Sequence, residues 1–148
     1  LYREAGAPVE FQLCFQARNP GKVQVPYADL WPGSDYVDQV GVDLYINPGS
    51  KLVSLQKRLE DGVLSQLRAL GKPWFIGETS CCDQLDRSVW MKESWQYLAT
   101  CDDLRVANYF LVDKNEPRQW ALHTPAEVQG FVEGYKAYAK ACAGAQIM

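Results

Sequence analysis

The sequence predicts an α/β fold in which parallel β-strands are joined by helical crossovers. Three observations support this prediction. The chain has 148 residues, 47% of them hydrophobic and 22% charged, so it can bury one core in a single domain. Segments that alternate every two residues are interleaved with segments that repeat every three or four. The resulting order is strand, strand, helix, strand, helix, strand, helix, which is typical of a parallel sheet with helical connections.

The charge balance and the hydropathy pattern disfavour two kinds of partner. Fifteen Lys and Arg residues against eighteen Asp and Glu residues give a formal net charge of −3. A protein that works mainly by neutralising phosphates would carry a positive excess, so nucleic acid is not expected as a partner. No run of eighteen apolar residues occurs, so neither a transmembrane helix nor a membrane partner is expected.

The five cysteines do not form a metal-binding pattern. None lies in a CxxC pair, and the chain has one histidine, so neither a structural zinc site nor another cofactor is expected. An odd count leaves at least one thiol unpaired within the chain. Buried thiols that pack as small hydrophobic groups are the favoured interpretation. A disulfide in an exported protein, for instance between Cys82 and Cys101, is the alternative.

The first two strands are predicted from their alternation. Apolar residues occupy every second position of residues 9–15, and the turn residues 19–21 follow. The alternation is sharper in residues 36–47. One face of that segment is aliphatic and carries Val40, Val42, Leu44 and Ile46. The other face is small or polar and carries Gly41, Asp43, Tyr45 and Asn47.

The remaining elements follow in order. A stripe of leucines predicts a helix that is capped by Ser50 and runs to about Leu70, where Gly71 and Pro73 end it. Residues 74–78 predict a short apolar strand, residues 88–98 a helix and residues 106–112 a strand. The sequence of residues 124–127 (TPAE) is a capping box with proline at the first helical position, so the last helix begins there.

Two architectures could hold these elements: a doubly wound open sheet and part of a (β/α)8 barrel. A sheet covered on both faces should have continuously aliphatic strands, whereas residues 36–47 have one polar face. That face suits the inner wall of a barrel, which we therefore favour. A complete barrel takes about 250 residues. We expect residues 1–148 to form a single domain, the half that contains strands five to eight, with the N-terminal half absent. Another chain or segment would complete the sheet.

Glu78 is the most unusual residue of the chain. Functional residues of both architectures lie at the carboxyl ends of the parallel strands. Glu78 ends an apolar strand, where it is poorly placed for solvent and poorly placed for a core. A carboxylate in such a position needs a partner or a function. A structural carboxylate that accepts hydrogen bonds from a loop is the alternative interpretation.

Several segments resemble glycoside hydrolases of clan A, especially the β-mannanase-like branch. Residues 36–45 (YVDQVGVDLY) are similar to the sixth strand of that barrel. Residues 71–80 (GKPWFIGETS) are similar to the seventh, in which an apolar run leads to the nucleophilic Glu. Residues 109–120, with Tyr109, Phe110 and Trp120, are similar to the eighth strand and its loop, and residues 9–19 to the fifth strand.

The resemblance implies retaining hydrolysis of a β-linked oligosaccharide or polysaccharide. That reaction uses two carboxylates about 5–5.5 Å apart. Glu78 matches the nucleophile, and Tyr45 is expected to donate a hydrogen bond that orients it. The acid/base Glu of the family lies on the fourth strand and has no match here, because Glu10 and Asp43 lie within strands. The chain alone is therefore expected to be inactive. A noncatalytic carbohydrate-binding or structural barrel fragment is the alternative.

Sugar-binding clefts also need flat apolar faces and polar partners. The residues expected to contact substrate are Trp31, Asp43, Tyr109 and Trp120. For each of the aromatic residues, a place in the core is the alternative. We interpret His123 as a loop residue rather than a base, and Arg18 and Lys114 as solvated charges rather than a site for an acidic group. An α/β hydrolase or a flavodoxin-like protein is disfavoured, since GxSxG and Gly-rich phosphate loops are missing.

Overall fold

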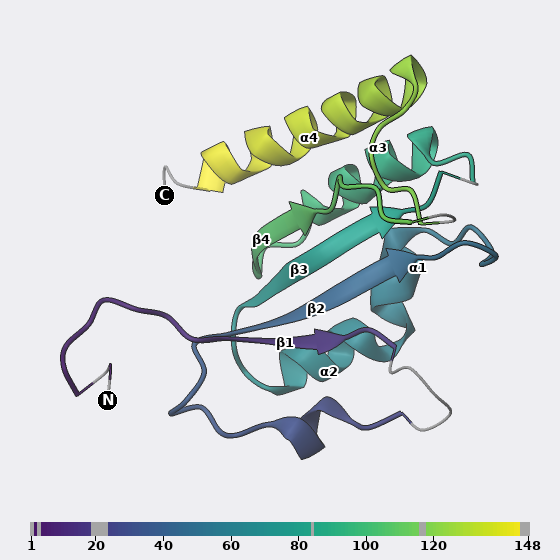
Figure 1. Cartoon of the computed structure of the whole chain (residues 1–148). Helices are drawn as coiled ribbons and strands as arrows, with labels where there is room; N and C mark the ends of the chain where they lie inside the picture. Colours follow the sequence, from purple (N-terminus) through teal and green to yellow (C-terminus); the bar gives the residue numbers. More distant parts are fainter. Residues whose placement is uncertain (1, 3, 19–23, 84, 116–117, 146–148) are drawn as a thin grey trace.

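Four parallel strands form one sheet in the computed structural model (Figure 1). The structure describes residues 2, 4–18, 24–83, 85–115 and 118–145. Residues 144 and 145 are described by their backbone alone. The strands are β1 (Gln12–Gln16), β2 (Gln39–Ile46), β3 (Trp74–Cys81) and β4 (Leu104–Tyr109). They lie side by side in sequence order. In a doubly wound sheet, the strand order would change direction at a switch point within the sheet. This confirms the predicted α/β fold, and the arrangement is that of half of a (β/α)8 barrel.

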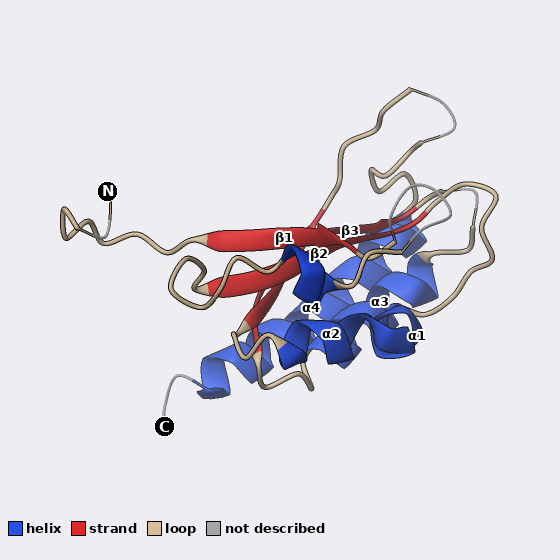
Figure 2. Cartoon of the chain, turned by 90° about the horizontal axis from the view of Figure 1, so that it is seen from below, coloured by secondary structure: helices blue, strands red, loops and turns tan. Residues whose placement is uncertain are grey.

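The helices of the described chain lie on one side of this sheet (Figure 2). They are the short 3₁₀-helix η1 (Tyr27–Leu30), α1 (Leu55–Arg58), η2 (Leu59–Val63), α2 (Leu64–Ala69), α3 (Ser88–Leu98) and α4 (Pro125–Ala145). None of these helices is long and apolar enough to cross a membrane.

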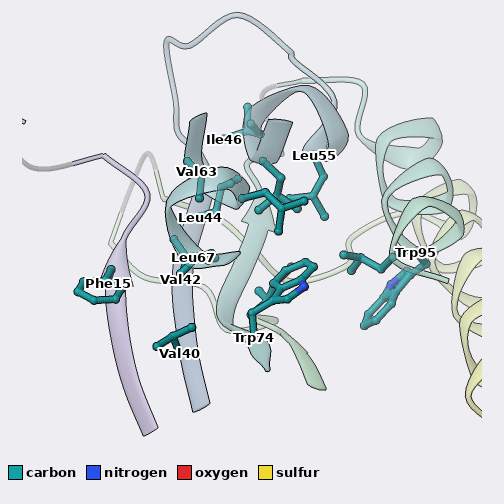
Figure 3. Packing of buried hydrophobic residues seen from close by; sticks show 14 of the residues in the cluster. Phe15, Val40, Val42, Leu44, Ile46, Leu55, Val63, Leu67, Trp74 and Trp95 are labelled. Carbon is teal, nitrogen blue, oxygen red and sulfur yellow. The ribbon is translucent and has the colours of Figure 1, made fainter. Parts of the chain in front are cut away.

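The hydrophobic core lies between the sheet and the helices (Figure 3). Its β2 members are the four aliphatic residues predicted to share a face, and none is more than 2% exposed. They pack in one cluster with helical leucines such as Leu55, Leu59 and Leu67. Asp43 and Tyr45 are half-buried on the opposite face, which has no helix over it and is called the open face below. The predicted orientation of β2 is confirmed.

The helical segment after β2 differs from its prediction. It begins at Leu55, where the Ser54 Oγ accepts a hydrogen bond from the backbone N–H of Lys57 at 3.2 Å, so Ser50 is not the cap. The helix is also interrupted, because Gly62 adopts φ of +93°, a conformation that glycine accommodates without strain. The leucine stripe survives because the pieces before and after the break bury the same face.

The ends of α3 and the start of α4 agree better with the sequence prediction than the ends of the strands. Helix α3 has the predicted bounds. The capping box is confirmed, since the N–H of Glu127 donates to the Thr124 Oγ1 at 3.2 Å and the N–H of Thr124 to the Glu127 Oε2 at 3.1 Å. Strand ends agree less well: the ends of β1 and β4 lie one to three residues from their predicted positions, and β3 continues to Cys81. The predicted turn at residues 19–21 lies outside the described residues.

Within the described chain, β1 and β4 each have one neighbour in the sheet. Completion of the sheet by another chain or segment stays a prediction. All five cysteines lie in the described part of the chain, and none of them forms a disulfide bond.

Candidate functional site

A β-bulge at Gly77 positions Glu78. In the register of β2 and β3, Val42 pairs with Ile76 and Asp43 pairs with Glu78, so Gly77 is one extra residue on β3. A Cβ atom at Gly77 would lie 2.5 Å from the Asp43 Oδ1 and 2.6 Å from the Cys14 Sγ. A larger residue would fit only if these two side chains moved. The extra residue also changes the phase of β3, which brings Glu78 onto the open face beside Asp43.

Tyr45, near the carboxyl end of β2, and Glu78, in the middle of β3, form a short hydrogen bond. Because β3 continues to Cys81 and Glu78 is exposed, the expectation that Glu78 ends its strand and is poorly placed for solvent is wrong. The Tyr45 Oη donates to the Glu78 Oε2 at 2.6 Å. Burial of the phenol, together with this bond to Glu78, raises the pKa of Tyr45 well above its ordinary value. The hydroxyl therefore remains protonated at neutral pH and acts as a donor to the carboxylate. The structure thus brings together the two residues to which the sequence assigned catalysis.

Aromatic rings surround Tyr45. The ring centroid of Trp120 lies 5.0 Å from that of Tyr45, and the ring centroid of Phe110 lies 6.1 Å from it in an edge-on arrangement. The Lys114 Nζ lies 4.8 Å above the Phe110 ring. Trp120 belongs to the site, but only 3% of it is exposed, so its ring supports Tyr45 and offers little open surface.

Two of the expected substrate contacts lie elsewhere. Tyr109 is on the helix side of the sheet, 5.2 Å from Phe131 and 6.4 Å from Trp95 between ring centroids. Neighbouring residues of a strand point to opposite faces, so Phe110 reaches the open face in its place. Trp31 is half-buried and packs against the hydrophobic core. Tyr109 therefore does not lie in the cleft beside Glu78, and Trp31 takes the alternative position against the core.

Asp43 is held by two side chains of β1. The Cys14 Sγ lies 3.2 Å from the Asp43 Oδ1, and the Gln16 Nε2 donates to the Asp43 Oδ2 at 3.0 Å. Burial, strengthened by the neighbouring Asp43, raises the pKa of the Cys14 thiol to about 12. Burial also raises the pKa of Cys81 to about 12. Both groups stay thiols near neutral pH, so neither has the thiolate character that a nucleophilic cysteine needs.

His123 connects the loops that follow β3 and β4. Its Nε2 lies 2.8 Å from the Asp113 Oδ2, and its Nδ1 lies 3.5 Å from the Asp83 Oδ2. The Asp113 Oδ1 accepts hydrogen bonds from the N–H groups of Trp120 and Ala121, both at 2.8 Å. The bond to Asp113 raises the pKa of His123. Asp113 therefore shapes the loop that carries Trp120, and His123 is a structural loop residue.

A buried arginine, which the sequence did not single out, supports the same region. Arg87 is 1% exposed, and its Nε donates to the Glu127 Oε1 at 2.9 Å. Its Nη1 donates to the carbonyl oxygens of Cys81 at 2.9 Å and Gln119 at 3.2 Å, and its Nη2 donates to that of Ala121. Arg87 thus joins the end of β3, the β4–α4 loop and the start of α4. No local pattern signals this role, since its partners other than Cys81 lie more than 30 residues away in sequence.

The site has no evident metal-binding set. Within the described residues, no group of three or more His, Cys, Asp or Glu side chains could hold a metal ion. What the geometry offers is a carboxylate with a phenol donor, and a second carboxylate beside it on the neighbouring strand.

The fold and the site thus define a class: a parallel α/β unit with a carboxylate–tyrosine pair on the open face of its sheet. No family model matches the chain, and no curated protein matches it. Among solved structures, it is similar to a GH128 (subgroup II) endo-β-1,3-glucanase from Sorangium cellulosum, with 18% identity and a TM-score of 0.46. The match covers 66% of this chain and 41% of that one, so the chain spans less than half of that protein's length. A likeness at this level concerns the backbone alone.

Proposed function

We propose that this chain is part of a retaining glycoside hydrolase that acts on β-linked glycans, with Glu78 as its nucleophile. The observation that carries the proposal is the 2.6 Å hydrogen bond from the Tyr45 Oη to the Glu78 Oε2 between the adjacent parallel strands β2 and β3. The resemblance of residues 36–45 and 71–80 to strands of β-mannanase-like enzymes supports the same pair.

The proposed reaction has two displacements. In the first, a Glu78 carboxylate oxygen bonds to the anomeric carbon while the glycosidic bond breaks, and a second carboxylic acid protonates the departing oxygen. In the second, that group takes a proton from water, the water oxygen bonds to the anomeric carbon, and the bond to Glu78 breaks. Tyr45 orients the nucleophile, since its donated hydrogen bond holds one carboxylate oxygen and favours the ionised form.

The second carboxylate is proposed to come from a further segment or another chain. Asp43 is the cross-strand neighbour of Glu78. Both oxygens of Asp43 already have partners on β1, the Cys14 thiol and the Gln16 amide. We therefore assign Asp43 to substrate contact and to the support of Gly77 and Glu78, and not to proton transfer.

A trapping experiment tests the nucleophile without the missing acid. Glycosides with a 2,4-dinitrophenyl leaving group need no protonation, and a fluorine at C2 slows hydrolysis of the covalent intermediate. The 148-residue chain would be incubated with the β-gluco and β-manno forms of this probe and analysed by intact mass and peptide mapping. We expect one fluoroglycosyl group on Glu78, none in Glu78→Gln, and full labelling in the control Glu10→Gln.

Two outcomes would contradict the proposal. The first is labelling that persists in Glu78→Gln or maps to another residue. The second is the absence of labelling by both probes in a chain that circular dichroism shows to be folded. Binding of the probes without labelling would favour the noncatalytic carbohydrate-binding alternative.

A further inference from the structure

A pocket adjoins the candidate site. It lies at the carboxyl ends of β1 and β2, has a volume of about 650 Å³, and is lined in part by Asp43 and Tyr45. Arg58 and Asp61, next to the interruption of the helix, also line it, as does Arg18 from the loop after β1. Its volume falls within the range of small-molecule sites, about 300–1,000 Å³.

The acidic residues that line this pocket have hydrogen-bond partners, whereas its arginines lack carboxylate partners within the described residues. Asp61 has a partner outside the pocket, since the Lys57 Nζ lies 3.0 Å from each of its oxygens. Asp43 accepts from two side chains of β1. By contrast, the Arg58 Nε is buried and has no hydrogen-bond partner among the described residues. Arg18 forms no ion pair within the described chain. With Asp61 offset by Lys57, two guanidinium groups face a single carboxylate.

We infer that this pocket is a subsite for an acidic sugar unit, whose carboxylate is bound by Arg58 and Arg18. A guanidinium group binds a carboxylate through parallel N–H···O bonds, and both Arg58 and Arg18 line the pocket. The Asn47 amide and the Ser50 hydroxyl line the same pocket and offer polar partners for sugar hydroxyls. The inference rests on the proposed function in that the acidic unit would be part of the glycan held at Glu78.

Paired probes that differ in one group test this inference. Methyl β-D-glucuronide and methyl β-D-glucoside differ only in the oxidation of C6, and the two galacto counterparts form a second pair. Binding would be followed by NMR titration of the 148-residue chain at low ionic strength. We expect a uronide to bind at least about tenfold more tightly than its neutral partner, since charge-assisted hydrogen bonds favour it. Salt should reduce the difference.

Matched variants locate the effect. Arg58→Gln and Arg18→Gln should each reduce the preference for the uronide, and Arg58→Gln should remove most of it. The control Arg105→Gln makes the same charge change at the other end of the sheet, where Arg105 lines a different pocket, and should leave the preference unchanged. Arg18 is exposed, so Arg18→Gln keeps the test decisive if Arg58→Gln fails to fold.

Three results would overturn the inference. They are equal binding of uronide and neutral sugar in both pairs, a preference that neither variant reduces, and inorganic sulfate that binds as tightly as the uronide and displaces it. The variant Glu78→Gln should keep the uronide preference. If the wild-type chain prefers the uronide but is not trapped at Glu78, only the catalytic proposal is contradicted. If it is trapped at Glu78 but does not prefer the uronide, only the subsite is contradicted.

Discussion

The ring of Trp120 lies against the ring of Tyr45, 5.0 Å between centroids, and Tyr45 in turn holds Glu78. Trp120 keeps this position because Asp113 accepts a hydrogen bond from its backbone N–H. The nucleophile candidate is therefore oriented through a series of contacts that begins in the β4–α4 loop. Arg87 also holds that loop, because its guanidinium group donates hydrogen bonds to the carbonyl oxygens of Gln119 and Ala121. Rigid support of this kind is what a preorganised site requires.

The first prediction concerns the orienting hydroxyl. Tyr45→Phe removes the bond to the Glu78 Oε2 and keeps the ring that packs on Trp120. We expect the rate of covalent trapping at Glu78 to fall by about 10- to 100-fold, the size of one charge-assisted hydrogen bond, with little change in stability. Tyr36→Phe is the control, because Tyr36 is 68% exposed. An unchanged trapping rate in Tyr45→Phe would show that Tyr45 does not orient the nucleophile.

The second prediction concerns the bulge. Gly77→Ala places a Cβ atom 2.5 Å from the Asp43 Oδ1 and 2.6 Å from the Cys14 Sγ, so we expect a loss of about 1–3 kcal/mol in the free energy of unfolding. Urea denaturation measures it. Cys14→Ala removes one of the two obstructing atoms, so the double variant should lose less than the sum of the single losses. Strict additivity would mean that Cys14 does not restrict this position.

The third prediction is a pH dependence. Asp113 raises the pKa of His123, so protonation of this ring stabilises the folded protein. The stabilisation by the Asp113–His123 pair is fully present below the unfolded-state pKa of histidine, about 6.5. It is lost as the pH rises through the higher folded-state pKa. Asp83 and Arg87 also act on this ring, in opposite directions. Because His123 is the one histidine of the chain, its ring protons can be titrated by NMR without ambiguity.

In this titration, the apparent pKa of His123 should lie above 6.5 and should fall in Asp113→Asn. Asp86→Asn alters an exposed carboxylate that bonds to Ser88 and does not contact His123, so it is the control and should leave the value unchanged. The thermal midpoint of the wild type should decrease from pH 5.5 to pH 8.5 more than that of His123→Gln. Parallel curves for the two proteins would contradict the stabilising role of the Asp113–His123 pair.

The fourth prediction concerns the buried ion pair. Glu127→Ala leaves the guanidinium of Arg87 buried without its carboxylate and also removes half of the capping box of α4. Loss of one member of a buried pair costs about 3–5 kcal/mol, so we expect a destabilisation of that order in urea denaturation. Glu133→Ala breaks the exposed pair with Lys92 on the same helix and should change stability little. Equal effects of the two substitutions would refute the structural importance of Arg87.

Local patterns in the sequence were sufficient for several features of the fold. The alternation of residues 36–47 predicted which face of β2 is buried, because a strand with one apolar face must turn it to the helices. Thr124 and Glu127 predicted the start of α4, because both partners of the capping box lie within one turn. The meeting of Tyr45 and Glu78 was expected from the resemblance to two barrel strands and not from a local pattern, and it depends on the bulge at Gly77.

The tertiary structure alone decided the features that depend on pairing across the chain. The bulge at Gly77 exists only relative to β2, and no pattern within β3 shows that one residue is extra. The same dependence explains Tyr109: its face is set by the register with β3, and a shift of one residue exchanges it with Phe110. Arg87 is buried because five acceptors from distant segments converge on it. The sequence by itself determines features that depend on a few neighbouring residues, such as helix starts and the buried face of a strand. Contacts between distant segments depend on strand register and packing, which only the tertiary structure fixes.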